Sequence, residues 1–272
     1  MIVLSDLVWT MGRARACKVI LICTLLGIGL FVLSDRKVNS NVKTRARYHM
    51  EQAQGPKKHV LLLGASVGLS WDIPALPQRI GGDRYEFEYV HGSPFDKSRV
   101  LNDILGRSEN KPDIIILKEC AAYFPGDLDQ YKALMVRWIG ECRDKSVIPI
   151  PTTVIPVTSL HAYKLFAHDL MNLRNPLRHG SPFKQNRLMS ILAYNDWIRS
   201  YCRDHGLVVL DLEAAVRYSG RKRSLRRDLA KMDGLHLKQK AYGLLDEIVW
   251  PTLAETERVE VRPEGPFSRN GR

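Results

Sequence analysis

The sequence predicts an α/β domain of three layers (α/β/α), with helices on both faces of a central parallel sheet of about five strands. Short apolar runs alternate with longer amphipathic stretches between His59 and Leu253. Strands that are separated by helices are joined by right-handed crossovers, which makes neighbouring strands parallel. This part of the chain has roughly two hundred residues, which is enough to bury one core.

Each expected strand follows from its apolar pattern. His59–Leu63 and Asp113–Leu117 are nearly continuous apolar runs, typical of strands that are buried on both faces. Tyr85–Val90 alternates apolar and polar residues, as a half-buried strand does. Val147–Val157 is a fourth strand interrupted by prolines, and Leu207–Leu212 is the fifth.

Three long helices are expected at Leu128–Lys145, Gln185–His205 and Lys238–Leu253, where apolar residues recur at helical spacing. Residues 158–184 fit no regular element well. A long irregular segment in a compact domain is typical of a lid, a binding loop or disorder, and the sequence leaves these open.

The first part of the chain has a different character. Val19–Leu33 is an uncharged apolar run that follows Arg13, Arg15 and Lys18. It is shorter than the ~17–25 residues of a membrane span. The pattern is typical of the apolar region of a signal peptide or of a short signal anchor.

Four parts are therefore expected: a signal anchor or signal peptide at 1–34, a polar basic linker at 35–58, a globular domain at 59–256 and a flexible tail at 257–272. The expected location is a membrane, with a single-pass N-terminal anchor and an exported domain. If the segment is cleaved, the domain is secreted or periplasmic. Basic residues on both sides of the apolar run leave the membrane orientation open.

The net charge of +12 suits an anionic partner. Seven basic residues gather between Arg217 and Lys231, either as a solvated loop or as a border of the active site that attracts anionic substrates. No pattern of a nucleic-acid-binding module is present, and no nucleic acid partner is expected. The five cysteines contain no C-x-x-C pair, so no metal site is expected.

Two distant motifs supply candidate catalytic residues. The first strand ends at Gly64 and is followed by Ser66, which places a hydroxyl at the carboxyl edge of the sheet, where open α/β folds bind ligands. A serine needs a base to accept its proton, and the base needs a third group to orient it. His236 is the candidate base, and Asp233 lies three residues before it.

The chain resembles the SGNH/GDSL hydrolases, a superfamily of flavodoxin-like esterases and lipases. Gly64-Ala65-Ser66 is similar to the family's Gly-Asp-Ser turn, and Asp233-Gly234-Leu235-His236 is similar to its Asp-x-x-His block. The resemblance implies a catalytic triad of Ser66, His236 and Asp233. It also implies an oxyanion hole formed by the N–H groups of Ser66 and Gly92.

The third block departs from the family. The resemblance implies an asparagine after the third strand that donates to the oxyanion, but this chain has Lys118-Glu119-Cys120 there. One such donor is worth about 10²–10³ in rate. We expect Glu119 and His91 to line the site or to contact substrate. Gly92 is either an oxyanion donor or a plain turn glycine.

The predicted function is a membrane-associated or exported serine hydrolase or esterase. Its acylated substrate is expected to be an envelope polysaccharide or lipid, with the N-terminal segment in contact with the membrane. Hydrolysis and acyl transfer use the same residues, and neither needs a metal or an organic cofactor. The missing asparagine motivates an alternative, a catalytically impaired module that binds a cell-envelope glycan or a protein partner. The segment Leu61–Gly68 lacks the G-x-G-x-x-G spacing of a dinucleotide site.

Overall fold

The computed structural model describes residues 57–81, 83–175, 177, 186–220 and 223–260. The predicted signal anchor and nearly all of the predicted linker lie outside these residues. Among the residues described, no helix has both the length and the apolar character needed to cross a membrane. The last helix continues to Glu260, so the chain is still helical where the flexible tail was predicted to begin.

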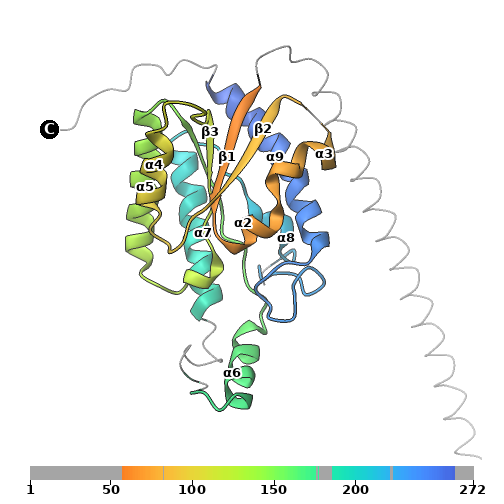
Figure 1. The fold of residues 1–272 in the computed structure, drawn as a ribbon. Helices are drawn as coiled ribbons and strands as arrows, with labels where there is room; N and C mark the ends of the chain where they lie inside the picture. The colour runs from red at the N-terminus through yellow and green to blue at the C-terminus, as the bar shows by residue number, and fades with distance from the viewer. Residues whose placement is uncertain (1–56, 82, 176, 178–185, 221–222, 261–272) are drawn as a thin grey trace, which may run out of the picture. The chain divides into compact units, whose positions relative to one another are not determined.

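A parallel sheet forms the centre of the domain (Figure 1). Its strands are β1 (Lys58–Gly64), β2 (Tyr85–His91), β3 (Ile114–Leu117) and β4 (Ile148–Pro151), in the order β2-β1-β3-β4. β1 lies between β2 and β3, and in its register Leu62 pairs with a residue of each neighbour. All the carboxyl ends therefore lie at one edge of the sheet, as the sequence predicted.

The predicted fifth strand, Leu207–Leu212, is reduced to one parallel bridge between Thr152 and Leu210. The Leu210 N–H donates to the Pro151 carbonyl oxygen (3.0 Å). The N–H groups of Ile148 and Thr152 donate to carbonyl oxygens on the β3 side, so the alternate positions, Pro149 and Pro151, face the fifth segment. Proline has no N–H, so a longer ladder cannot form on that edge. β4 is much shorter than predicted and ends at Pro151, the residue that pairs with Leu117, the last residue of β3.

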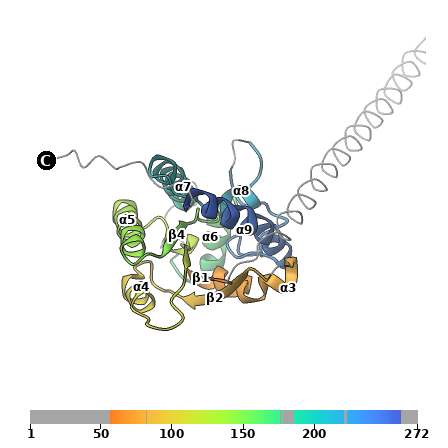
Figure 2. The same cartoon turned by 90° about the horizontal axis from the view of Figure 1, so that it is seen from above.

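Helices cover both faces of the sheet (Figure 2). One face carries α2 (Ser66–Trp71), α3 (Leu76–Ile80), α8 (Leu212–Val216) and α9 (Gln239–Glu260). The other face carries α4 (Ser98–Leu105), α5 (Leu128–Asp144) and α7 (Asn186–Asp204). Two short 3-10 turns, η1 (Ile73–Ala75) and η2 (Ala121–Tyr123), complete the connections. The three-layer α/β/α fold is therefore confirmed, with four strands in place of about five.

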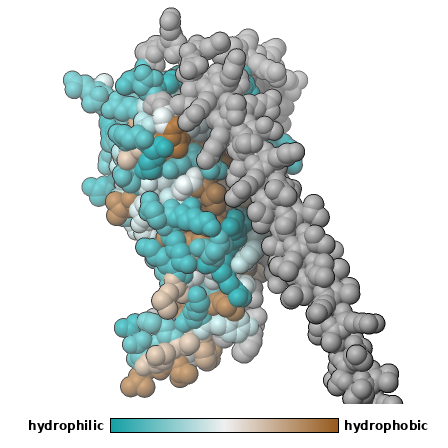
Figure 3. Space-filling model, turned by 90° about the vertical axis from the view of Figure 1, so that its right-hand side faces the viewer, coloured by the Kyte–Doolittle hydropathy of each residue, from teal (hydrophilic) through white to brown (hydrophobic). Residues whose placement is uncertain are grey.

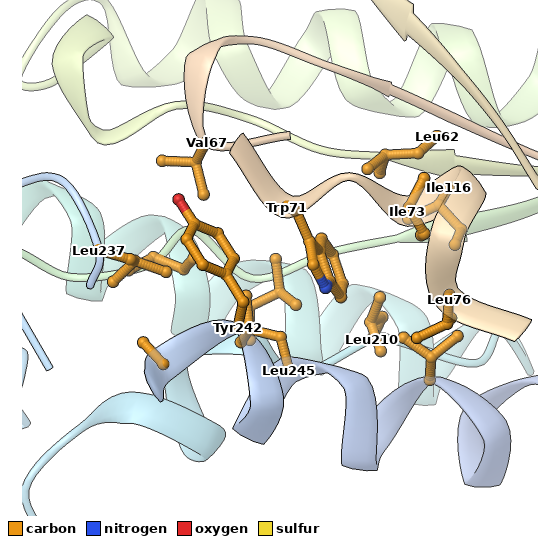
Figure 4. Packing of buried hydrophobic residues seen from close by; sticks show 14 of the residues in the cluster. Leu62, Val67, Trp71, Ile73, Leu76, Ile116, Leu210, Leu237, Tyr242 and Leu245 are labelled. Carbon is orange, nitrogen blue, oxygen red and sulfur yellow. The ribbon is translucent and has the colours of Figure 1, made fainter. Parts of the chain in front are cut away.

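The strand period of two divides the core into two clusters. Leu62 points to the cluster with α9, whereas Leu61 and Leu63 point to the cluster with α5 and α7. In the first cluster Trp71 packs near Tyr242 and Leu245 of α9 (Figure 4). Trp71 also donates its Nε1–H to the buried Asp246 (2.8 Å). This bond and the packing fix the short helix that begins at Ser66.

The helix α6 (His161–Met171) lies inside the segment that was expected to be irregular. Its two buried residues, His161 and Asp169, are polar, and none of its apolar side chains belongs to either core cluster. The helix extends beyond the carboxyl edge of the sheet (Figure 1). Apolar side chains are exposed at its end, with Met171 83% and Leu173 96% accessible (Figure 3).

Candidate active site

Ser66 lies where β1 passes into α2, at the carboxyl edge of the sheet. Ala65 is extended, and its carbonyl oxygen accepts the first hydrogen bond of the helix from Gly68 (2.7 Å). Ser66 is the first helical residue and is partly exposed. Its own N–H belongs to the first turn, where amides have no partner within the helix. The hydroxyl and this N–H therefore lie together at the edge of the sheet.

Asp233 and His236 are brought together. The His236 Nδ1 lies 2.5 Å from one carboxylate oxygen of Asp233, while the other oxygen accepts the N–H groups of Leu235 and His236 (3.0 Å each). Burial alone disfavours the charge on Asp233, but these hydrogen bonds outweigh it and lower the pKa of the carboxyl below its usual value. An ionised carboxylate holds the proton on Nδ1, which leaves Nε2 as an acceptor.

The turn that contains Asp233 and His236 is held against the start of α6. Gly234 has a φ of +74°, and a Cβ at this position would overlap the side chain of Thr158. The Thr158 N–H donates to the Gly234 carbonyl oxygen (2.9 Å). The Nδ1 of the buried His161 lies 2.7 Å from the Asp233 carbonyl oxygen. Glycine is thus required here both by the backbone conformation and by close packing.

Arg187 completes this support from the first turn of α7. Its Nη1 donates to His161 Nε2 (2.8 Å), and its Nε donates to the Phe124 carbonyl oxygen (2.7 Å). A guanidinium is always a donor, so His161 Nε2 accepts and Nδ1–H donates to Asp233. Arg187 was not predicted from the sequence, because α7 is marked there by its apolar residues and nothing local distinguishes this arginine.

Tyr89 links the predicted residue His91 to the serine turn. Its hydroxyl lies 3.2 Å and 3.1 Å from the carbonyl oxygens of Gly64 and Ala65, and 3.0 Å from His91 Nδ1. Burial raises the pKa of Tyr89 to about 12. A Cβ at Gly68 would lie 2.7 Å from the Tyr89 ring, so the glycine leaves room for it. His91 itself is exposed and reaches the turn through Tyr89.

Glu119, which was predicted to line the site or contact substrate, is instead enclosed. It is 2% exposed, and both of its carboxylate oxygens lie 2.6 Å from the Nζ of the buried Lys97. The rings of Phe95, Tyr123 and Trp138 lie 5.3–5.6 Å from the same ammonium group. Burial raises the pKa of Glu119 to about 7, although the charge of Lys97 opposes the shift. This carboxylate therefore acts as the partner of a buried cation.

The N–H group of Gly92 already has a hydrogen-bond partner. This group, predicted to donate to the oxyanion, donates to the Gly64 carbonyl oxygen (2.7 Å) as a continuation of the β1–β2 ladder. A Cβ here would lie 2.7 Å from Lys97 Cδ and 3.0 Å from Leu63 Cδ1. The absence of a side chain therefore makes room for the stem of Lys97. As an oxyanion donor, Gly92 would first have to give up its bond to Gly64.

Three arginines of the basic segment before Asp233 are ion-paired: Arg217, Arg223 and Arg226. Arg223 binds Asp196 and Glu213, and Arg226 binds Asp228 (2.9 Å). Glu213 is fully buried and is also 2.8 Å from Arg199. Arg223 thus fastens the loop to α7 and α8, whereas the Arg226 pair lies within the loop. Within the described ranges, no group of three or more His, Cys, Asp or Glu side chains is placed to hold a metal ion.

Comparison with known proteins relates this arrangement to one fold. No protein-family model matches the chain, and no curated protein is detectably similar to it in sequence. Among solved structures, a GDSL-like lipase from Bacteroides thetaiotaomicron superposes with a TM-score of 0.52 at 16% identity, covering 81% of this chain and 98% of that one. An acylhydrolase from Bacteroides fragilis gives 0.51 at 17% identity, covering 79% and 96%.

A lipolytic protein of the G-D-S-L family from Desulfitobacterium hafniense superposes with a TM-score of 0.53 at 15% identity, covering 72% of this chain and 99% of that one. Nearly the whole of each of these three structures is thus covered, at identities too low for a sequence match. The described part of this chain has the fold of the SGNH/GDSL hydrolases.

Proposed function

We propose that this protein is a serine-dependent ester hydrolase or acyltransferase in which Ser66 is the nucleophile, His236 the general base and Asp233 the group that orients it. The contact between Asp233 and His236 is the observation that supports this most directly, because it presents Nε2 as a proton acceptor. The fold, shared with lipases and acylhydrolases, gives independent support.

In this mechanism His236 Nε2 takes the proton of Ser66 as Oγ attacks the acyl carbonyl carbon. The imidazolium that forms is stabilised by the Asp233 carboxylate, and it then gives its proton to the leaving alcohol. Water, or an acceptor hydroxyl, attacks the acyl-enzyme and releases Ser66. The Ser66 N–H is one donor available to the oxyanion.

A second candidate function is a module that binds a cell-envelope glycan or a protein partner without catalysis. Two observations favour it: the Gly92 N–H is engaged by Gly64, and Glu119 offers no donor to an oxyanion. In this alternative the contact between Asp233 and His236 only stabilises a turn. The two functions differ in whether Ser66 is activated.

A fluorophosphonate probe distinguishes them, since it reacts covalently with activated serines. We expect the full chain to be labelled, and labelling to be lost in Ser66→Ala and in His236→Ala. Ser70→Ala is the matched control, because Ser70 lies on the exposed side of the same short helix. It should be labelled like the wild type. If folded wild-type protein is not labelled, or if Ser66→Ala is labelled equally, the hydrolase proposal is wrong.

We also propose that the enzyme acts at a membrane on acyl groups of envelope polysaccharides or lipids. The support is the apolar run Val19–Leu33 with its preceding basic residues, which lies outside the described residues. Fractionation of cells that express the full chain tests this. Recovery in the membrane fraction is expected, and loss of that recovery on deletion of 1–34 would assign it to the segment.

A further inference from the structure

Arg187 differs from the other half-buried arginines of the domain. Each of those in the described ranges has a carboxylate within 3.8 Å; they are Arg84, Arg107, Arg199, Arg217, Arg223 and Arg226. Arg187 is equally enclosed, yet within the same ranges it bonds to a carbonyl oxygen and an imidazole nitrogen and to no carboxylate. Burying an unpaired charge is costly, so a cation of this kind needs an anionic partner.

The guanidinium is held rigidly. Its Nε bonds to the Phe124 carbonyl oxygen and its Nη1 bonds to His161, so two directions of the planar group are fixed. Among the described residues no partner is found for Nη2. Burial lowers the pKa of Arg187, which agrees with a charge that no carboxylate offsets. A pre-oriented guanidinium with free N–H groups is suited to bind a carboxylate or a phosphate.

Its position relates it to the proposed catalytic residues. Phe124 follows η2, the turn after the carboxyl end of β3, and β3 lies beside β1, the strand that leads to Ser66. His161 contacts the main chain of Asp233. Arg187 therefore lies between the segment after the carboxyl end of β3 and the turn that contains His236. Glu119, which follows the carboxyl end of β3, is already paired with Lys97. It therefore does not supply the negative charge that Arg187 lacks.

We propose that Arg187 forms an anion subsite beside the active site, so that the preferred substrates are esters with a carboxylate or phosphate near the scissile bond. The anion binds the guanidinium, takes no part in the bond changes and fixes the ester relative to Ser66. This inference rests on the proposed hydrolase function and specifies its substrate class.

Matched ester pairs test the proposal in the full chain. One pair carries the charge on the alcohol side: para-acetoxybenzoate against its neutral methyl ester. The second carries it on the acyl side: the half-ester of adipic acid with para-nitrophenol against para-nitrophenyl hexanoate. The variants are Arg187→Gln and Arg187→Lys. Arg203→Gln is the control, because Arg203 is exposed at the opposite end of the same helix.

We expect the wild type to have a higher kcat/KM for the charged member of at least one pair. Arg187→Gln should lower that preference roughly tenfold to hundredfold, as loss of a charge-assisted hydrogen bond does. Arg187→Lys should retain part of the preference, and Arg203→Gln all of it. The alcohol-side and acyl-side pairs show on which part of the ester the anion lies.

Two results would overturn the proposal: a wild type with no preference in either pair, or an Arg187→Gln variant that loses activity equally on charged and neutral esters. The second result would make Arg187 a positioning residue for His161 and Asp233. If the neutral esters are cleaved and Ser66 is labelled, the hydrolase function stands while the anion subsite fails. If no ester is cleaved and no label is incorporated, the proposed function itself has failed.

Discussion

Two pairs of ionisable side chains at the carboxyl edge of the sheet are built in opposite ways. In the turn before α9, the side chains of Asp233 and His236 are 44% and 41% exposed. At the exit of β3, those of Glu119 and Lys97 are each 1% exposed and are surrounded by aromatic rings. Both pairs have short contacts, 2.5 Å and 2.6 Å. Their environments differ far more than their geometry.

The difference indicates different roles. An exposed carboxylate–imidazole pair can exchange protons with water and substrate, as acid–base chemistry requires. A buried ammonium–carboxylate pair cannot do so without leaving a charge in a low-dielectric interior, where each ion depends on the other. The proposed function therefore places catalysis in the first pair, and the burial of the second pair indicates an architectural role. Replacing one member of each pair separates the two roles.

The largest effect is expected at Asp233. Under the proposed function, the amide in Asp233→Asn no longer holds the proton on His236 Nδ1, so Nε2 carries the proton and cannot accept one from Ser66. The kcat should therefore fall about 10⁴-fold. The measurement is hydrolysis of a neutral para-nitrophenyl ester. Asp228→Asn is the control, because Asp228 lies in the same loop and pairs with Arg226 and Lys240 at the surface. A loss below tenfold, or an equal loss in both variants, contradicts the catalytic role.

The second prediction concerns the buried pair. Lys97→Met leaves the Glu119 carboxylate without its cation, so the free energy of unfolding should fall by about 3–5 kcal/mol in denaturant titrations. The double variant with Glu119→Leu should lose less, because neither charge remains. Lys132→Met breaks a surface pair with Asp129 and should cost under about 1 kcal/mol. If the double variant is less stable than Lys97→Met, this expectation is wrong, and the two side chains stabilise the fold by more than neutralising each other's charge.

The contrast also explains what the sequence could predict. Asp233 and His236 are three residues apart, so their contact was visible as a motif. Ser66 follows an apolar run, so its place at the sheet edge was visible too. Lys97 and Glu119 are twenty-two positions apart. They meet only because the segment after β2 folds against the segment after β3. No local pattern distinguishes such a buried lysine from a solvated one, so Glu119 was mistaken for a residue that lines the site.

The predictions of the fold that were wrong have the same origin. The three-layer architecture follows from local periodicity, and it was predicted. The fifth strand is lost because Pro149 and Pro151, which lack N–H groups, lie at the positions of β4 that face it. Only the pairing of β4 with β3 decides which positions those are. Helix α6 is held at its start by His161, a polar residue that contacts the Asp233 carbonyl oxygen across seventy-two positions of sequence. Tertiary contacts, rather than propensity, decide both.

The smallest effect is expected at Gly92, which packs against Lys97 and bonds to Gly64, two residues before Ser66. In Gly92→Ala the new Cβ would lie 2.7 Å from Lys97 Cδ, and overpacking of this kind costs about 1–3 kcal/mol of unfolding free energy. Gly140→Ala in α5 is the control, because its Cβ meets nothing within 4 Å and alanine favours a helix by up to about 1 kcal/mol. Alanine keeps the N–H group at position 92. A loss of stability with kcat nearly unchanged therefore assigns Gly92 to the packing of Lys97. A loss of kcat at unchanged stability would instead make the position part of the oxyanion hole, and the separation between a catalytic and an architectural pair would fail there.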